Sequence, residues 1–177
     1  METIHEKAFA LLQRCEVITV ATLDEKGFPR PVPVVKIRAE KPFTIWFATG
    51  TSSDKTAHLR RNPRAGISFF DRGDSVALTG TAEVIEYPAV KKIMWQEWFI
   101  KHFPGGVEDP EYCLVRFEAR KGVFYIEDKF VKSVLKYPSS NYYKSQTTHS
   151  IIRYPEIELS TDYQKHLHNH TLSTRQK

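Results

Sequence analysis

The sequence predicts a mainly β protein, an antiparallel β domain with a few peripheral helices. Apolar residues alternate with period two in several short segments, and this period is typical of strands with one buried face. Turn signatures separate successive segments, DEKG at residues 24–27 and DRGD at residues 71–74. The pattern is therefore that of successive antiparallel strands with short helices before or between them.

The expected elements follow in chain order. An amphipathic helix is expected over residues 3–14, where apolar residues recur at helical spacing. A short basic helix begins at Asp54 or Lys55 and ends at Asn62, because the residue before a proline disfavours helical geometry. The expected strands cover residues 16–22, 29–38, 43–48, 65–70, 75–86, 112–119 and 122–127.

Two segments carry additional information. The strand at residues 29–38 begins PRPVP, and proline lacks the N–H that a central ladder needs. Its start must lie at an edge, at a bulge, or where the backbone lines a site. A helix over residues 89–103 is apolar on several sides and needs more than one packing partner, which either a second subunit or a deep position in one domain would supply.

Hydroxyl residues cluster directly after the strand at residues 43–48. Thr49, Ser52 and Ser53 surround a turn that Gly50 allows, and Lys55 follows in the first turn of the short helix. Free helix N–H groups, hydroxyls and an ammonium group are the donors that a phosphate prefers. The residues also fit a Ser-capped turn followed by a solvated helix, and Asp54 opposes an anion. Residue types alone leave both interpretations open.

Arg30 and Lys36, in the segment RPVPVVK, lie just upstream of this loop. If their strand pairs with the strand at residues 43–48, both cations could reach the same phosphate. The alternative is that they are ordinary exposed cations of an edge strand.

Charge is unevenly distributed along the 177 residues. Residues 1–129 hold 19 Lys and Arg against 18 Asp and Glu, a net of +1, whereas residues 130–177 hold 7 against 3, a net of +4. We therefore expect one folded domain at residues 1–129 and a polar, basic C-terminal tail at residues 130–177, partly ordered or disordered. A tail of this kind could contact nucleic acid without specificity, but nucleic acid is not the expected partner.

Other signals exclude several classes of protein. Cys15 and Cys113 form no CxxC pair and are expected to be free thiols. No stretch has the length of a signal peptide or a membrane span, so we expect a cytoplasmic protein. The alternating trio His166, His168 and His170 is not expected to be a physiological metal site. There is no GxSxG, Walker or GxGxxG motif, and no catalytic side chain can be assigned.

The order of these segments resembles a known family. The strands EVITVATLDEKGFPRPVPV and FTIWFATGTSSDKTAHLRRNP, then AGISFF, LTGTAEVIE, a Trp-bearing helix and FPGGVEDPEY, resemble the pyridoxamine 5′-phosphate oxidase-like FMN-binding split barrels, general stress protein 26 type. The resemblance covers about residues 5–127 and leaves the tail outside.

This resemblance implies a six-stranded antiparallel Greek-key split barrel, a homodimer, and FMN at the subunit interface. It assigns the FMN phosphate to Thr49, Ser52, Ser53 and Lys55, with Arg30 and Lys36 as further contacts, and it puts Ser75 near the flavin ring. Trp95 and Trp98 could lie near the ring from the partner subunit or pack in a core.

The chain also departs from the family pattern. Asp54 stands where oxidases of vitamin B6 phosphates usually carry Arg, and their Arg- and His-bearing substrate motif has no counterpart after Gly122. Oxidation of pyridoxamine phosphate is therefore not expected. The sequence favours an FMN-dependent oxidoreductase of unidentified substrate. The alternatives are a non-catalytic flavin-binding or redox-responsive stress protein, or a variant that binds a deazaflavin or haem.

Overall fold

The computed structural model describes residues 2–136, 143–144 and 151–152. The chain divides into two units, Met1–Tyr137 and Pro138–Lys177. In the second unit, β8 (Tyr143–Lys144) pairs with β9 (Ile151–Ile152). The trio His166, His168 and His170 lies outside the described residues. Within the described part, no helix combines the length and the apolar composition that crossing a membrane requires.

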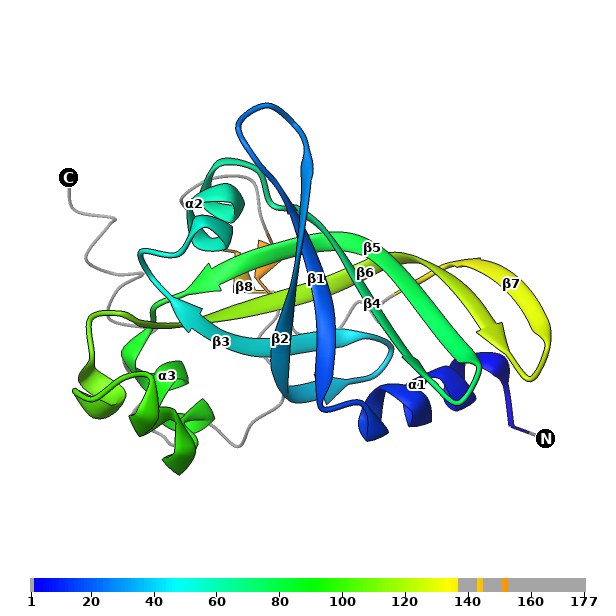
Figure 1. Cartoon of the computed structure of the whole chain (residues 1–177), viewed down its shortest axis with the longest axis horizontal. Helices are drawn as coiled ribbons and strands as arrows, with labels where there is room; N and C mark the ends of the chain where they lie inside the picture. The colour runs from blue at the N-terminus through cyan, green and yellow to red at the C-terminus, as the bar shows by residue number, and fades with distance from the viewer. Residues whose placement is uncertain (1, 137–142, 145–150, 153–177) are drawn as a thin grey trace. The chain divides into compact units, whose positions relative to one another are not determined.

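The first unit is an antiparallel β-barrel (Figure 1). Six strands follow one another in the order β3-β2-β1-β4-β5-β6, and pairing of β3 with β6 closes the barrel. The order β4-β1-β2-β3 within it is that of a Greek key. The predicted mainly β fold, a closed six-stranded antiparallel barrel with flanking helices, is thus confirmed. The strands are β1 (Val17–Leu23), β2 (Pro29–Glu40), β3 (Thr44–Gly50), β4 (Arg64–Asp71), β5 (Asp74–Ile85) and β6 (Tyr112–Ile126).

A seventh strand, β7 (Lys129–Val134), adds to the outer side of β6. The first unit therefore continues past residue 129, where the sequence suggested that the tail begins. The strands expected at residues 112–119 and 122–127 form one continuous strand, because Gly122 is not a turn residue but pairs with Leu78 of β5.

Three helices flank the barrel. Helix α1 (Ile4–Arg14) begins with a capping box between Thr3 and Glu6, and its buried residues Leu11 and Leu12 join the barrel core. At the C-terminal end of α1, Arg14 pairs with Asp71 of the β4–β5 turn at 3.5 Å. Helix α2 (Asp54–Arg61) is followed by Pro63. The carbonyl of Pro63 accepts a hydrogen bond from Ala82 N, near the other end of β5. The two helices therefore lie at opposite ends of β5 (Figure 1).

The helix expected over residues 89–103 is interrupted. Helix α3 (Pro88–Met94) ends before Trp95, whose backbone is extended, and a 3-10 helix, η1 (Glu97–Lys101), follows. The break lets the Trp95 ring contact two other rings. Its centroid lies 5.5 Å from that of Phe99 and 5.1 Å from that of Tyr112. Aromatic packing within the same chain thus supplies the partners that the pattern required. Trp98 remains 41% exposed.

The prolines of β2 lie at an open edge, as one of the sequence interpretations predicted. Pro29, Pro31 and Pro33 stand opposite residues of β1, while β3 pairs with β2 only from Lys36 to Glu40. Lys36 N donates to Glu16 O and therefore faces β1, and successive residues of a strand direct their nitrogens to opposite sides. The three prolines lie an odd number of residues from Lys36, so their nitrogens face away from β1. The ladder between β1 and β2 therefore loses no hydrogen bond to proline.

The register between β5 and β6 shifts at Thr79 and Gly80, because β6 has one additional residue, Arg120, between their partners Lys121 and Ala119. A Cβ added to Gly80 would lie 1.9 Å from the carbonyl oxygen of Glu118, so backbone would have to move. We expect Gly80→Ala to destabilise the protein by about 3 kcal/mol in urea unfolding. The matched control is Gly66→Ala in β4, where the nearest atom would lie 3.5 Å away and where we expect a change within about 1 kcal/mol. Equal losses in the two variants would contradict this account.

Candidate functional site: the loop between β3 and α2

The hydroxyl-rich loop at residues 49–53 joins the end of β3 to the start of α2. Ser53 is the N-cap of α2, and its Oγ accepts from Thr56 N at 3.4 Å. Ser53 N donates to Gly50 O at 3.1 Å, and Thr56 Oγ1 donates to the same carbonyl at 2.8 Å. These bonds hold the loop in one tight turn at the positive end of the helix dipole.

Three of the predicted site residues meet in this turn. Lys55 Nζ donates to Thr49 Oγ1 at 3.0 Å, and Thr49 Oγ1 lies 3.2 Å from Ser53 Oγ. Lys55 and Ser53 are half-buried and Thr49 is buried. An ammonium group and two hydroxyls at the start of a helix form the donor set that suits an oxyanion such as a phosphate. We call Thr49, Ser53 and Lys55 the cradle.

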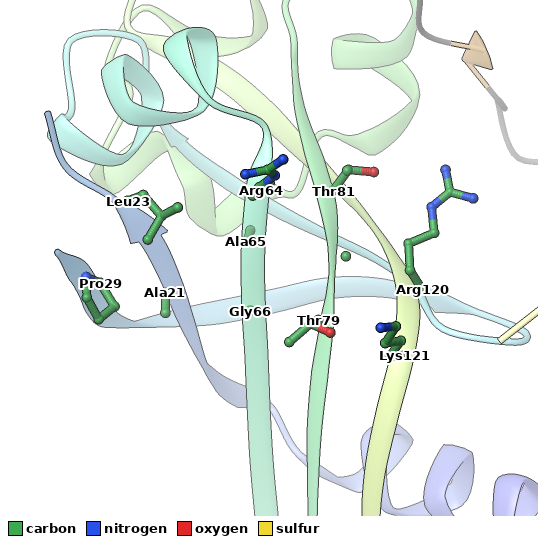
Figure 2. A pocket seen from close by; sticks show the side chains of 11 residues that line it. Ala21, Leu23, Pro29, Arg64, Ala65, Gly66, Thr79, Thr81, Arg120 and Lys121 are labelled. Carbon is green, nitrogen blue, oxygen red and sulfur yellow. The ribbon is translucent and has the colours of Figure 1, made fainter. Parts of the chain in front are cut away.

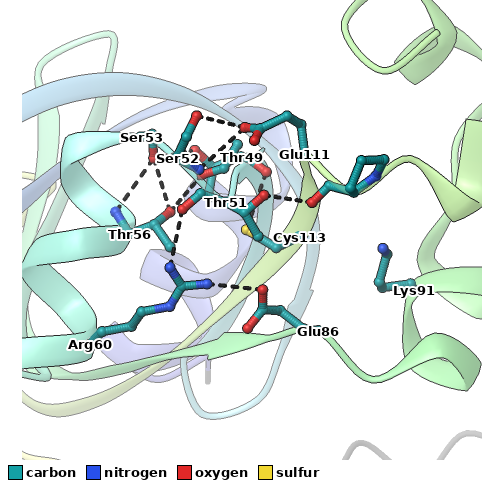
Figure 3. A network of polar contacts seen from close by, with 12 residues as sticks. Thr49, Thr51, Ser52, Ser53, Thr56, Arg60, Glu86, Lys91, Glu111 and Cys113 are labelled. Atoms are coloured by element: carbon teal, nitrogen blue, oxygen red, sulfur yellow. Dashed lines mark hydrogen bonds and ion pairs between the residues drawn. The ribbon is translucent and has the colours of Figure 1, made fainter. Parts of the chain in front are cut away.

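Ser52 is the fourth predicted phosphate residue of the loop, and it already binds a carboxylate (Figure 3). Oε2 of Glu111 accepts from Ser52 Oγ at 2.6 Å and from Ser52 N at 3.2 Å. Thr51 is fixed to the same segment, since its N donates to Glu111 O at 2.9 Å and its Oγ1 donates to Pro110 O at 2.6 Å. The loop therefore presents an N–H and an O–H to an anion, but that anion belongs to the chain itself.

Sequence reasoning missed Glu111. It lies at the end of FPGGVEDPE, sixty residues after the loop, and the pairing of Gly50 with Tyr112 brings it there. The only available signal was an acidic residue directly before a strand that could pair with β3. The side-chain and backbone donors of Ser52 hold the pKa of Glu111 below its ordinary value, so this carboxylate is ionised at neutral pH.

Neighbouring residues fix the loop and α2 from other sides. Arg60 donates to Thr51 O at 3.2 Å and pairs with Glu86 at 2.9 Å (Figure 3). The Cys113 thiol donates to Thr49 O at 3.3 Å, and burial raises its pKa to about 11, so it remains a neutral donor. Both cysteines are free thiols, as predicted.

Arg30 lies on the side of the barrel where α2 packs. It stands directly opposite Thr22 of β1, and Thr22 Oγ1 lies 2.9 Å from Nδ1 of the buried His58 in α2. Residues opposite one another share a face of the sheet, so Arg30 is on the same face as the contact to α2. Its side chain is exposed.

Lys36 and Ser75 are not brought to the cradle within one chain. Lys36 Nζ donates to Gln13 O of α1 at 3.3 Å, and burial lowers the pKa of this lysine. Ser75 follows the β4–β5 turn, where it stands between Phe70 and Tyr125. Both residues therefore lie toward the α1 end of the barrel, away from α2.

Comparison with known proteins assigns the family. Residues 4–125 match the family model of pyridoxamine 5′-phosphate oxidase. The chain belongs to the pyridoxamine 5′-phosphate oxidase family. The family resemblance seen in the sequence is thereby confirmed, and the match covers the barrel from α1 to β6. No curated protein matches the chain.

Solved structures similar to this family member share its fold. A Clostridium acetobutylicum protein related to general stress protein 26 has a TM-score of 0.66 at 24% identity, covering 73% of this chain and 92% of that one. General stress protein 26 of Bacillus anthracis has a TM-score of 0.61 at 20% identity, covering 73% and 98%. A haem-binding protein of Mycobacterium smegmatis has a TM-score of 0.63 at 16% identity, covering 76% and 59%.

The Ser52–Glu111 contact makes a pH-dependent contribution to stability. Because the folded-state pKa of Glu111 is lowered, the contribution is fully present above its ordinary pKa near 4.5 and is lost as the pH falls through the folded value. We expect Glu111→Gln to melt at a lower temperature than the unmodified protein at pH 7, and the difference to shrink between pH 5 and about pH 3.

The matched control is Glu108→Gln, which removes an exposed carboxylate of the same loop. Its melting temperature should follow that of the unmodified protein across the whole range. A difference for Glu111→Gln that stays constant with pH would contradict an ionised contact to Ser52.

Proposed function

We propose that this member of the pyridoxamine 5′-phosphate oxidase family is a flavoprotein that holds the phosphate of FMN in the cradle. The convergence of Lys55 Nζ, Thr49 Oγ1 and Ser53 Oγ at the start of α2 carries this proposal. Members of the family commonly bind flavin, which agrees with this donor set. Each charge-assisted hydrogen bond contributes about 1.5–3 kcal/mol, so a few of them retain a phosphorylated cofactor.

The residues present fit a phosphate in part. Lys55 supplies one cation, and Arg30 is a second candidate because it lies on the α2 side of the barrel. Ser52 would have to release Glu111 before it could donate to a phosphate, and Asp54 is a further nearby carboxylate. We therefore assign the phosphate to Thr49, Ser53 and Lys55 and treat Ser52 as a residue for which Glu111 competes.

Bound FMN would supply hydride or single-electron chemistry, and the chain would bind and orient it. No catalytic side chain is required for this role, and the proposed activity is that of an oxidoreductase acting on a small molecule. The departures at Asp54 and after Gly122 argue against pyridoxamine phosphate as the substrate.

We further propose that two copies of the chain associate and enclose the flavin. A row of aromatic side chains crosses the outer face of the sheet, with Phe70, Tyr125 and Phe130 exposed by 79%, 39% and 62%. Register puts these residues side by side, and Ser75 lies in the row between Phe70 and Tyr125. Several exposed aromatic side chains on one face of a sheet are typical of an interaction surface. Ser75 would thus meet the flavin at the interface rather than at the cradle of its own chain.

Two alternatives to turnover have specific support. The general stress protein 26 neighbours suit a non-catalytic flavin-binding or redox-responsive stress protein, and the similar M. smegmatis protein is described as haem-binding. The visible spectrum of the purified protein separates flavin from haem. Reduction of the flavin by a nicotinamide nucleotide, and its reoxidation by an acceptor, separates an enzyme from a reservoir.

Lys55→Ala tests the cradle. We expect its affinity for FMN to fall by about tenfold to a hundredfold, since one charge-assisted hydrogen bond is lost, while its weaker affinity for riboflavin stays the same. Quenching of flavin fluorescence measures both affinities. Lys92→Ala, which removes an exposed lysine of α3, is the matched control and should bind FMN normally. An equal loss of affinity for FMN and for riboflavin would show that the cradle does not bind the phosphate.

Phe70→Asp tests the aromatic row. Sedimentation should give a dimer for the unmodified protein and a dissociation constant at least about tenfold higher for the variant, because a charge would be buried at the interface. Phe28→Asp is the control, since Phe28 is 64% exposed in the β1–β2 connection and outside the row. A monomeric unmodified protein, or a Phe70→Asp variant that dimerises normally, would contradict the proposal.

A further inference from the structure

A groove of about 420 Å³ crosses the outer face of the barrel over β1, β4, β5 and β6 (Figure 2). Register explains its position, because Ala21, Gly66, Thr79 and Lys121 form one row across these four strands. Ala21 lies between buried Val20 and Thr22 in β1, so this row faces away from the core. The size falls within the range of small-molecule sites.

Small residues make the groove hollow. Gly66 has no side chain between Ala21 and Thr79, and its Cβ position would leave ordinary contact distance to the nearest atom, 3.5 Å. No side chain occupies the position above Gly66, and a Cβ there would be in ordinary contact with the carbonyl oxygen of Leu78. Leu23 and Pro29 form an apolar wall at the β1 side of the groove (Figure 2).

The charge of the groove is positive. Arg64, Arg120 and Lys121 line it, and no lining residue is acidic. Arg120 is bonded to Glu118 at 3.3 Å, so an anion site here depends on Arg64 and Lys121. In the described part of the chain, no ion pair joins Arg64 or Lys121 to a carboxylate.

The groove is separate from the cradle but shares a face with Ser75. Arg64 begins β4, just after the C-terminal end of α2, whereas the cradle lies at the N-terminal end of this eight-residue helix. On β5, Ser75, Ala77 and Thr79 alternate with the buried Val76 and Leu78, so Ser75 and the groove lie on one side of the sheet. A flavin ring near Ser75 would thus lie on the same face as the groove.

We infer that this groove binds the anionic group of a small organic acid, and that this acid is the reaction partner of the flavin. The cations and the hydroxyls of Thr79 and Thr81 would bind a carboxylate or phosphate, and the wall of Leu23 and Pro29 would contact its apolar body. The assignment as a substrate site rests on the proposed flavin function, whereas the anion site does not.

The test uses the full-length purified protein and two fluorescent probes of similar size. Anilinonaphthalene sulfonate carries an anionic group, and N-phenylnaphthylamine does not. The double substitution Arg64→Gln with Lys121→Gln should lower the affinity for the sulfonate probe by about fivefold, because two exposed charge contacts are lost. The affinity for the neutral probe should not change. Added salt should lower the affinity for the sulfonate probe more in the unmodified protein than in this variant.

Two further variants serve as controls. Lys26→Gln with Lys92→Gln removes the same charge at exposed positions outside the groove and should bind both probes normally. Gly66→Val fills the floor of the groove and should weaken both probes, with circular dichroism used to confirm that the barrel is intact. Sulfonate binding that is equal in the unmodified protein, the Arg64→Gln with Lys121→Gln variant and the Gly66→Val variant would overturn the site.

Flavin content separates this inference from the proposed function. The Arg64→Gln with Lys121→Gln variant should retain flavin like the unmodified protein. Loss of flavin in that variant would assign the groove to the cofactor and overturn a substrate site. The predicted probe pattern in a protein that binds no flavin would support the anion site and refute the flavin function alone.

Discussion

The pairing of β3 with β6 is the interaction on which the rest of the structure depends. It closes the barrel, and it also decides what the loop after β3 meets, because Gly50 stands opposite Tyr112. Glu111 and Pro110 consequently lie against Ser52 and Thr51. The same register puts Cys113 beneath the carbonyl of Thr49. A contact made to complete the fold thus fixes the geometry of the turn that holds the cradle.

Most of the fold could be predicted because its signals are local. Period-two alternation and the turns at residues 24–27 and 71–74 identify strands without reference to distant residues. The break at Trp95 could not be predicted in this way, since it depends on aromatic contacts with Tyr112 across the chain. Thr49, Ser53 and Lys55 are close in sequence, so their contact is a local feature, whereas Glu111 reaches the loop through a long-range strand pairing. Ser75 lies away from the cradle because β5 carries it toward the α1 end of the barrel.

The cradle and the groove differ in the charged residues that surround a candidate anion. Beside the cradle, the donors of Ser52 are already engaged by Glu111, and Asp54 adds a second negative charge. A phosphate there gains from the helix dipole and the ammonium group but meets two carboxylates. In the groove, Arg64 and Lys121 meet no acidic lining residue. The cradle and the groove therefore differ in the number of carboxylates that an anion would meet.

The prolines of β2 limit how copies of this chain can associate. Their nitrogens occupy the open edge of the strand and can donate no hydrogen bond, so another strand cannot extend the sheet there. Edge-to-edge polymerisation, a hazard of many β proteins, is closed off along this half of β2. Copies that met along this half of β2 would therefore have to contact one another through side chains rather than through strand pairing.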